Sequence, residues 1–121
     1  MSITRANVEE LVAAQLTRIT QPDLVACISQ LLIHPRLEQV GWDYGDPDQT
    51  YPCWIVAVDS RIGLAFTYSE QGFGPENPWG MFWMGANQSM GMDSSWFLTL
   101  EDLFRDSPSW PGVNPPNYEV R

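Results

Sequence analysis

The chain contains no lysine. Its 121 residues include 15 acidic side chains against 6 arginines and one histidine, a formal net charge of −9 at pH 7. P-loop and Schiff-base chemistry both require a lysine, so the sequence excludes both. Contact with nucleic-acid phosphates or with an anionic membrane surface needs clustered basic residues, which this composition cannot supply. We therefore expect no direct binding to nucleic acid or to membranes.

Long apolar runs are missing as well. No uninterrupted apolar segment approaches the roughly 20 residues of a membrane-spanning helix. The N-terminal segment, with Glu9 and Glu10, is typical of an amphipathic helix and predicts no signal peptide. These two features predict a cytoplasmic location.

Cysteine and histidine are scarce. Cys27 falls in a predicted helix and Cys53 in a predicted strand, both among apolar neighbours, which favours two reduced, buried thiols over a disulfide. His34 is the one histidine, too few with two cysteines for a zinc site. It precedes Pro35 at a predicted helix end, where the helix dipole favours its charged form. We predict no metal, no cofactor and no enzymatic activity.

Two helices are predicted in the first third of the chain. From Asn7, which with Glu10 resembles a capping box, apolar residues recur at helical spacing. Pro22 and Asp23 are typical of a second helix start, and Pro35 predicts its end near His34. The two apolar faces consist of Val8, Leu11, Val12, Leu16 and Ile19, and of Leu24, Ile28, Leu31 and Leu32.

Strand patterns dominate the next part of the chain. Val40, Trp42 and Tyr44 alternate with polar or small residues, as in a half-buried strand. Further strands are predicted at 51–58, 62–68 and 79–84, separated by a turn at 45–48 and by loops at 69–78 and 85–95.

These segments predict a single α+β domain over residues 1–121, because helices and strands are segregated along the chain. The predicted parts are two helices in 1–35, a mostly antiparallel sheet of about four strands in 37–98, a short helix capped by Thr99 in 99–106, and an irregular, Pro-rich tail in 107–121. We expect the helices to cover one face of the sheet, and the other face to be either exposed or covered by the long loops.

Two segments resemble ligand-binding loops but lack residues that such loops require. Gly72-Phe73-Gly74 lacks the third glycine of a dinucleotide-binding loop, and Pro75 removes a backbone N–H that a phosphate would need. The acids from Asp43 to Asp48 lack the glycine and glutamate of a calcium-binding EF-hand loop. They are predicted to be solvated turn residues.

Acids and large apolar side chains in the loops suggest a binding surface. If the loops converge, their acids form one negative face, and Trp79 with two methionines adds an apolar anchor. The predicted partner-binding residues are Asp43, Asp46, Asp48, Glu70, Glu76, Trp79, Met90, Met92 and Asp93. Such a face predicts a basic protein partner, although the acids are equally compatible with a merely solvated surface.

Three short stretches resemble motifs of small bacterial proteins: Gly72-Phe73-Gly74-Pro75, Pro78-Trp79-Gly80, and Ser89 to Ser94 before Trp96-Phe97. In size, acidity and helix-then-sheet order the chain is similar to immunity proteins of polymorphic and contact-dependent-inhibition toxin systems. The resemblance implies a cytosolic inhibitor that occludes a toxin domain, often a basic nuclease.

Three alternatives stay open. Tryptophan platforms beside carboxylates are typical of a small-ligand or carbohydrate-binding module. A pair of carboxylates could serve a hydrolase, although no spacing selects a pair. A self-complementary aromatic surface would give a homodimer.

Overall fold

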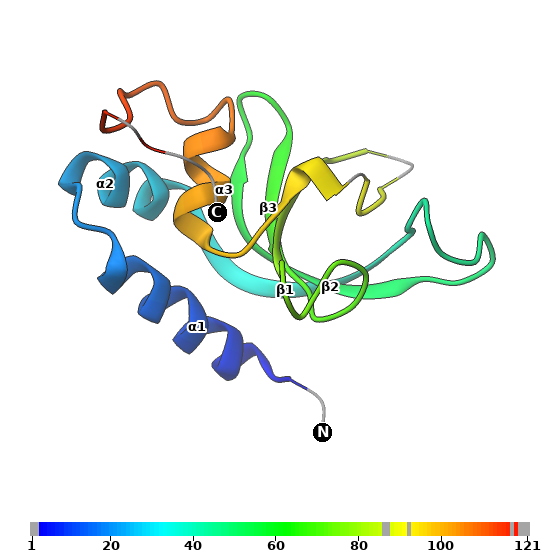
Figure 1. Ribbon diagram of the computed structural model, residues 1–121. Helices are drawn as coiled ribbons and strands as arrows, with labels where there is room; N and C mark the ends of the chain where they lie inside the picture. Colours follow the sequence, from blue (N-terminus) through cyan, green and yellow to red (C-terminus); the bar gives the residue numbers. More distant parts are fainter. Residues whose placement is uncertain (1–2, 86–87, 92, 117, 119–121) are drawn as a thin grey trace.

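The computed structural model describes residues 3–85, 88–91, 93–116 and 118, with the side chain of Asp93 left undescribed. Its elements follow one another as helices, then strands, then a last helix (Figure 1). They are α1 (Arg5–Arg18), α2 (Pro22–Leu31), β1 (Leu32–Val40), β2 (Tyr51–Asp59), β3 (Leu64–Tyr68), β4 (Trp79–Trp83), the 3-10 turn η1 (Asp93–Ser95), β5 (Trp96–Phe97) and α3 (Leu100–Asp106).

The strands form one antiparallel sheet in the order β1-β2-β3-β4-β5, so each strand pairs with its neighbour in sequence. This confirms the predicted α+β class with two N-terminal helices and a C-terminal helix. The sheet has five strands rather than about four, because Trp96 and Phe97 add a two-residue strand beside β4. No helix in the described ranges is long and apolar enough to cross a bilayer.

Side-chain caps fix the helix starts. Thr4 caps α1: its hydroxyl accepts from the Asn7 N–H at 3.2 Å, and the Asn7 amide oxygen accepts from the Thr4 N–H at 3.0 Å. The predicted cap at Asn7 was therefore three residues too late. Pro22 opens α2 as predicted, and Thr99 caps α3 by accepting from the Asp102 N–H at 3.1 Å.

The boundary between helices and sheet lies earlier than predicted. Helix α2 ends at Leu31 and β1 starts at Leu32, so His34 and Pro35 belong to a strand. Proline is tolerated there because β1 is an edge strand, where the missing N–H breaks no ladder. The predicted dipole role of His34 is wrong: the exposed imidazole lies 3.8 Å from the Glu9 carboxylate instead.

Trp42 was also predicted to lie in a strand. Strand β1 ends at Val40, so Trp42 and Tyr44 belong to the connection from β1 to β2. Aromatic alternation with polar residues alone cannot separate an edge strand from an ordered loop, because both leave one side of the chain exposed.

The helices pack against one face of the sheet (Figure 1). Side chains of β2 and β3 on this face meet those of all three helices, and Phe66 stacks on Phe104 with ring centroids 4.0 Å apart. The buried core on this side includes Val8, Leu24, Ile28, Val56, Phe66, Leu103 and Phe104. Burial of these large apolar groups supplies the main driving force for folding.

The second face of the sheet is covered by the connection from β4 to β5. This agrees with one of the two predicted alternatives, in which the long loops cover this face. The buried side chains of Met90, from this connection, and of Trp96, from β5, pack on Val40, Cys53, Ile55, Ala65 and Phe82. The Trp96 indole N–H donates to the Met90 carbonyl at 2.6 Å, which fixes this connection on the sheet.

Gly80 allows the Trp96 ring to pack against the sheet. A Cβ at Gly80 would overlap the indole ring of Trp96, so the ring lies directly on the bare backbone of β4. Only glycine allows such a close approach.

The described part of the tail contains no helix or strand, in agreement with the predicted irregular tail, and Arg105 holds it against the helices. The guanidinium is 2% exposed and donates to Glu101 (2.9 Å), to the Gln21 amide oxygen (2.9 Å) and to Asn114 (3.0 Å). It also lies over the Tyr118 ring, 5.0 Å from its centroid. One buried cation thus joins α3, the N-cap residue of α2 and the C-terminal segment.

We expect Gly80→Ala to lower the free energy of unfolding by about 2 kcal/mol, because the added methyl group displaces Trp96. Urea denaturation followed by tryptophan fluorescence measures this change. Gly85→Ala is the matched control, since no atom of the described residues lies within 4 Å of a Cβ at that position. Equal stability of the two variants would show that Trp96 does not rest on Gly80.

Candidate functional site

Two connections far apart in sequence meet beside β1. Gly41 forms a parallel bridge with Ser89: its N–H donates to the Gln88 carbonyl at 3.2 Å, and its own carbonyl accepts from the Met90 N–H at 2.9 Å. The Ser89 hydroxyl donates to the Asp43 carboxylate at 3.1 Å. These bonds hold the β1–β2 connection against the β4–β5 connection.

An aromatic cluster brings the β3–β4 loop to the same place. Trp42 makes edge-to-face contacts with Tyr44, Tyr51 and Phe73 at centroid distances of 6.0, 5.6 and 5.4 Å. Phe73 comes from the loop between β3 and β4, so this loop meets the other two connections at the aromatic cluster. Tyr44 is 56% exposed and presents the cluster to solvent.

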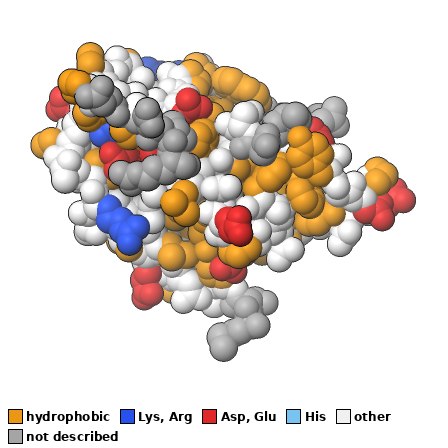
Figure 2. All heavy atoms as spheres, viewed as in Figure 1, with side chains coloured by type: hydrophobic (Ala, Val, Ile, Leu, Met, Phe, Trp, Pro, Cys, Tyr) orange, Lys and Arg blue, Asp and Glu red, His pale blue; other side chains and the backbone are white. Residues whose placement is uncertain are grey.

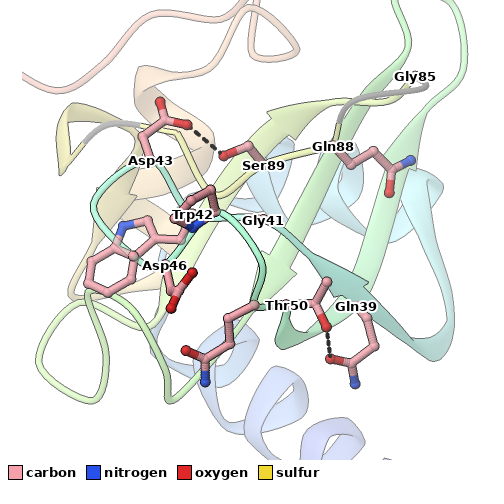
Figure 3. Close-up of a pocket in the computed structure, with 12 residues that line it drawn as sticks. Gln39, Gly41, Trp42, Asp43, Asp46, Thr50, Gly85, Gln88 and Ser89 are labelled. Atoms are coloured by element: carbon pink, nitrogen blue, oxygen red, sulfur yellow. Dashed lines mark hydrogen bonds between the residues drawn. The ribbon is translucent and has the colours of Figure 1, made fainter.

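A groove of about 900 Å³ opens between these connections (Figure 3). Among the described residues that line it, Asp43 and Asp46 are the charged ones, and none is an arginine, lysine or histidine. The remaining side chains are mainly amides and hydroxyls, and Thr50 donates to Gln39 at 3.3 Å. The lining residues are Gln39, Gly41, Trp42, Asp43, Gly45, Asp46, Pro47, Gln49, Thr50, Gly85, Gln88 and Ser89. The groove is therefore rich in hydrogen-bond acceptors and carries negative charge.

Asp43, Asp46 and Asp48 form no ion pair with a basic side chain among the described residues. The four ion pairs found in the described part of the chain join other residues, so Asp43, Asp46 and Asp48 keep uncompensated charges. Asp46 accepts from the Asp48 N–H at 2.9 Å, a local turn bond that leaves its second carboxylate oxygen available. In Figure 2, acidic and hydrophobic side chains lie together at the right-hand end of the molecule, where Figure 1 places the β1–β2 connection.

The predicted acids divide into two groups. Asp43 and Asp46 line the groove, and exposed Asp48 belongs to the same connection. Glu70 and Glu76 are exposed in the β3–β4 loop but do not line the groove.

The predicted apolar anchor is wrong for Trp79 and Met90. Trp79 is 2% exposed in the helix-side core, and Met90 is 0% exposed beneath the β4–β5 connection. Burial in a packed core removes both side chains from any partner surface. Met92 and the Asp93 side chain lie outside the described residues.

Sequence patterns missed the aromatic residues that border the groove. Trp42 and Tyr44 matched a strand pattern, which hid their place in a loop. The one available signal was their position among Asp43, Gly45 and Asp46, which are turn-forming residues.

A second cavity of about 570 Å³ lies between α2, the β2–β3 turn and the tail. Asp59 is fully buried there, and its carboxylate accepts from Arg61 at 2.9 and 3.1 Å and from the Ser109 hydroxyl at 2.7 Å. These hydrogen bonds to Arg61 and Ser109 lower the pKa of Asp59 to about 2. The cluster ties the tail to the sheet, and its charges already satisfy one another.

Both cysteine thiols are free, and burial raises the pKa of each. The pKa of the Cys53 thiol reaches about 12, so this buried group stays protonated at neutral pH. Cys27 is partly buried and donates to the Ser109 carbonyl at 3.4 Å. Across the described residues, no group of three or more His, Cys, Asp or Glu side chains could hold a metal ion.

Comparisons with protein-family models, with curated proteins and with solved structures find no match for this chain. The resemblance to immunity proteins therefore stays a prediction, and the groove is the main basis for a functional proposal.

We expect Asp59→Asn to lower the free energy of unfolding at pH 7 by about 2 kcal/mol, because it weakens charge-assisted bonds at a buried site. The folded-state pKa of Asp59 lies below its ordinary value of 3.8. The carboxylate therefore stabilises the fold above about pH 4, and this stabilisation is lost as the pH falls towards 2.

Urea denaturation at pH 7, 4 and 2.5 tests this sign. The difference in the free energy of unfolding between wild type and Asp59→Asn should become smaller as the pH falls towards 2.5. Asp106→Asn is the control, since Asp106 is exposed and joins none of the ion pairs found in the described chain. A gap that widens in acid would contradict the assigned role of Asp59.

Proposed function

We propose that this protein is an acidic binding protein of immunity type that inhibits a basic protein partner. Basic side chains of the partner bind in the groove beside β1 and are thereby covered. The supporting observation is the groove itself, whose described lining holds Asp43 and Asp46 and no basic residue. Arginine and lysine side chains of a partner would supply the missing counter-charges.

The carboxylates favour arginine in particular. A guanidinium can donate two parallel hydrogen bonds to one carboxylate, and the amide oxygens of Gln39, Gln49 and Gln88 offer further acceptors. A net charge of −9 also attracts a basic partner over a distance, which raises the association rate. Attraction of this kind weakens with added salt.

Tyr44 takes the place of the wrongly predicted anchor. It is exposed beside the groove and is supported from behind by Trp42 and Phe73. Tyrosine is one of the residues that contribute most to protein interfaces, since it combines a large apolar ring with a polar end. We propose that Tyr44 packs on the partner while the acids pair with its basic side chains.

Inhibition would follow from occlusion. A toxin or nuclease domain binds its nucleic-acid substrate through basic residues, and a surface of carboxylates can cover the same residues. We place this activity in the cytoplasm, where two unpaired cysteines would stay reduced.

The triple variant Asp43→Asn, Asp46→Asn, Asp48→Asn tests the groove. A fluorescently labelled arginine-rich peptide is the first probe, and fluorescence anisotropy measures its affinity at low and high salt. We expect the triple variant to bind at least about tenfold more weakly at low salt, with a smaller salt dependence, because three carboxylates are lost. The inhibited partner, once captured from cell lysate and purified, should show the same loss.

The control carries the same change in net charge at exposed acids of the helices: Glu10→Gln, Asp23→Asn and Asp106→Asn. It should bind nearly as wild type if the groove is the site. Equal weakening of both triple variants would mean that only overall charge matters, and the proposed groove would be wrong.

A carbohydrate-binding role is the second candidate, favoured by the aromatic cluster beside the amide-rich groove. A sugar would stack on Tyr44 or Trp42 and bond to the carboxylates and amides. We expect such a ligand to quench tryptophan fluorescence in the wild type and not in Trp42→Phe. A flat response across a panel of oligosaccharides would reject this role.

A further inference from the structure

Strand β1 contains a bulge near its start. Its residues Ile33–Pro35 lie opposite a single residue of β2, Val56, because the register of the pairing shifts between Leu32 and Arg36. Extra residues of this kind bend a strand away from its partner. Such bulges are over-represented beside functional sites, so the space next to this one is a candidate binding site.

A cavity of about 380 Å³ lies between this bulge and helix α1, and we call it the α1–β1 cavity. Val12 of α1, Pro35 of β1 and Val56 of β2 line it and are buried. Leu16 and Leu32 line it as well, but they are only half-buried. A concave apolar surface that the fold leaves partly open is typical of a small-molecule site.

Glu9 and His34 are the only polar side chains among the described residues that line this cavity. Glu9 is 49% and His34 is 71% exposed, so both lie at the opening of the cavity rather than in its interior. The His34 Nδ1 lies 3.8 Å from the Glu9 carboxylate, which is too far for a hydrogen bond. No other bond to this carboxylate is found in the described chain, so it can accept hydrogen bonds from a ligand.

This arrangement selects ligands by charge. A carboxylate-bearing ligand would bring a second negative charge to Glu9, in a chain whose net charge is −9. An amine that is protonated at neutral pH instead donates hydrogen bonds to the carboxylate and supplies its counter-charge.

The size of the cavity sets the apolar part of the ligand. An apolar cavity of about 150 Å³ holds benzene, so the α1–β1 cavity has room for roughly ten carbon atoms. The side chain of a partner's lysine has the same charged end, but its stem of about four carbons fills less than half of that space. A small amine with a longer apolar body fits better.

We propose that the α1–β1 cavity binds a small organic cation, an amine whose alkyl or ring body has roughly six to ten carbon atoms. Its ammonium group pairs with Glu9 at the opening, and its apolar body packs between α1 and the bulge of β1. This site is separate from the proposed inhibition of a basic protein, since the cavity and the acidic groove beside β1 share no lining residue.

Isothermal titration calorimetry with octylamine tests the site, and 1-octanol, octanoate and butylamine are the comparison ligands. We expect octylamine to bind at least about tenfold more tightly than 1-octanol, because its ammonium group pairs with Glu9. Octanoate should bind more weakly than either. Butylamine should also bind at least about tenfold more weakly than octylamine, since each buried methylene group contributes about fourfold in affinity.

Two results of these titrations overturn the proposal. One is that octylamine does not bind. The other is that octanoate binds as tightly as octylamine, which would show that the charge at Glu9 plays no part.

Glu9→Gln separates a specific site from general attraction of cations by an acidic protein. We expect this variant to bind octylamine about tenfold more weakly or worse, because the ammonium group loses its counter-charge. Glu10→Gln is the matched control: it removes the same charge from the next residue of α1, which is exposed and does not line the cavity. Equal effects of the two variants would contradict the assigned role of Glu9.

Ala13→Phe tests the place of the apolar body, because Ala13 is an exposed residue that lines the cavity. The added ring should occupy the space and abolish octylamine binding. Ala14→Phe, the same change at an exposed residue that does not line the cavity, should bind octylamine as wild type does. Undiminished binding by a folded Ala13→Phe variant would refute the site, and Glu9→Gln still tests it if Ala13→Phe does not fold.

The arginine-rich peptide distinguishes this proposal from the proposed inhibition. Both phenylalanine variants should bind that peptide as wild type does, since they leave the acidic groove unchanged. Octylamine binding should likewise persist in the triple variant of Asp43, Asp46 and Asp48, and its loss there would mean that octylamine binds in the groove instead.

Discussion

The contact between the Trp96 indole and the bare backbone of Gly80 is the constraint on which much of this structure depends. It seats the β4–β5 connection on the second face of the sheet, and the indole N–H holds the Met90 carbonyl there. Ser89 is next to Met90, so the same contact places it beside Gly41 and Asp43. One close approach of a ring to a strand therefore builds both the second core and one wall of the groove.

The distribution of cations explains why the groove keeps its negative charge. Arg5 bonds to a backbone carbonyl, Arg36 and Arg105 pair with acids on their own elements, and Arg61 pairs with Asp59 at the end of the adjoining strand β2. Each of these acids lies outside the β1–β2 connection. The chain has no lysine and few arginines, and these four arginines bond to groups outside the β1–β2 connection, so they leave the carboxylates of Asp43, Asp46 and Asp48 charged.

The sequence patterns predicted elements better than surfaces. Apolar periodicity and capping residues such as Thr99 depend on local chemistry, and they placed the helices and the antiparallel sheet correctly. Whether a large side chain is exposed depends on what packs over it. Trp79 and Trp83 lie on one short strand, yet the first is buried in the helix-side core and the second is largely exposed. Composition could suggest an acidic surface, but hydrogen bonds between distant loops determined which acids share a groove.

The Arg105 clamp has a consequence for the limits of the folded unit. The guanidinium is 2% exposed, and Asn114 and the Tyr118 ring surround it together with residues of α2 and α3. A chain shortened before Asn114 would leave a buried cation short of acceptors, a more costly change than the loss of an irregular surface segment. The proline-rich segment is thus as much a part of the folded domain as the helices it joins.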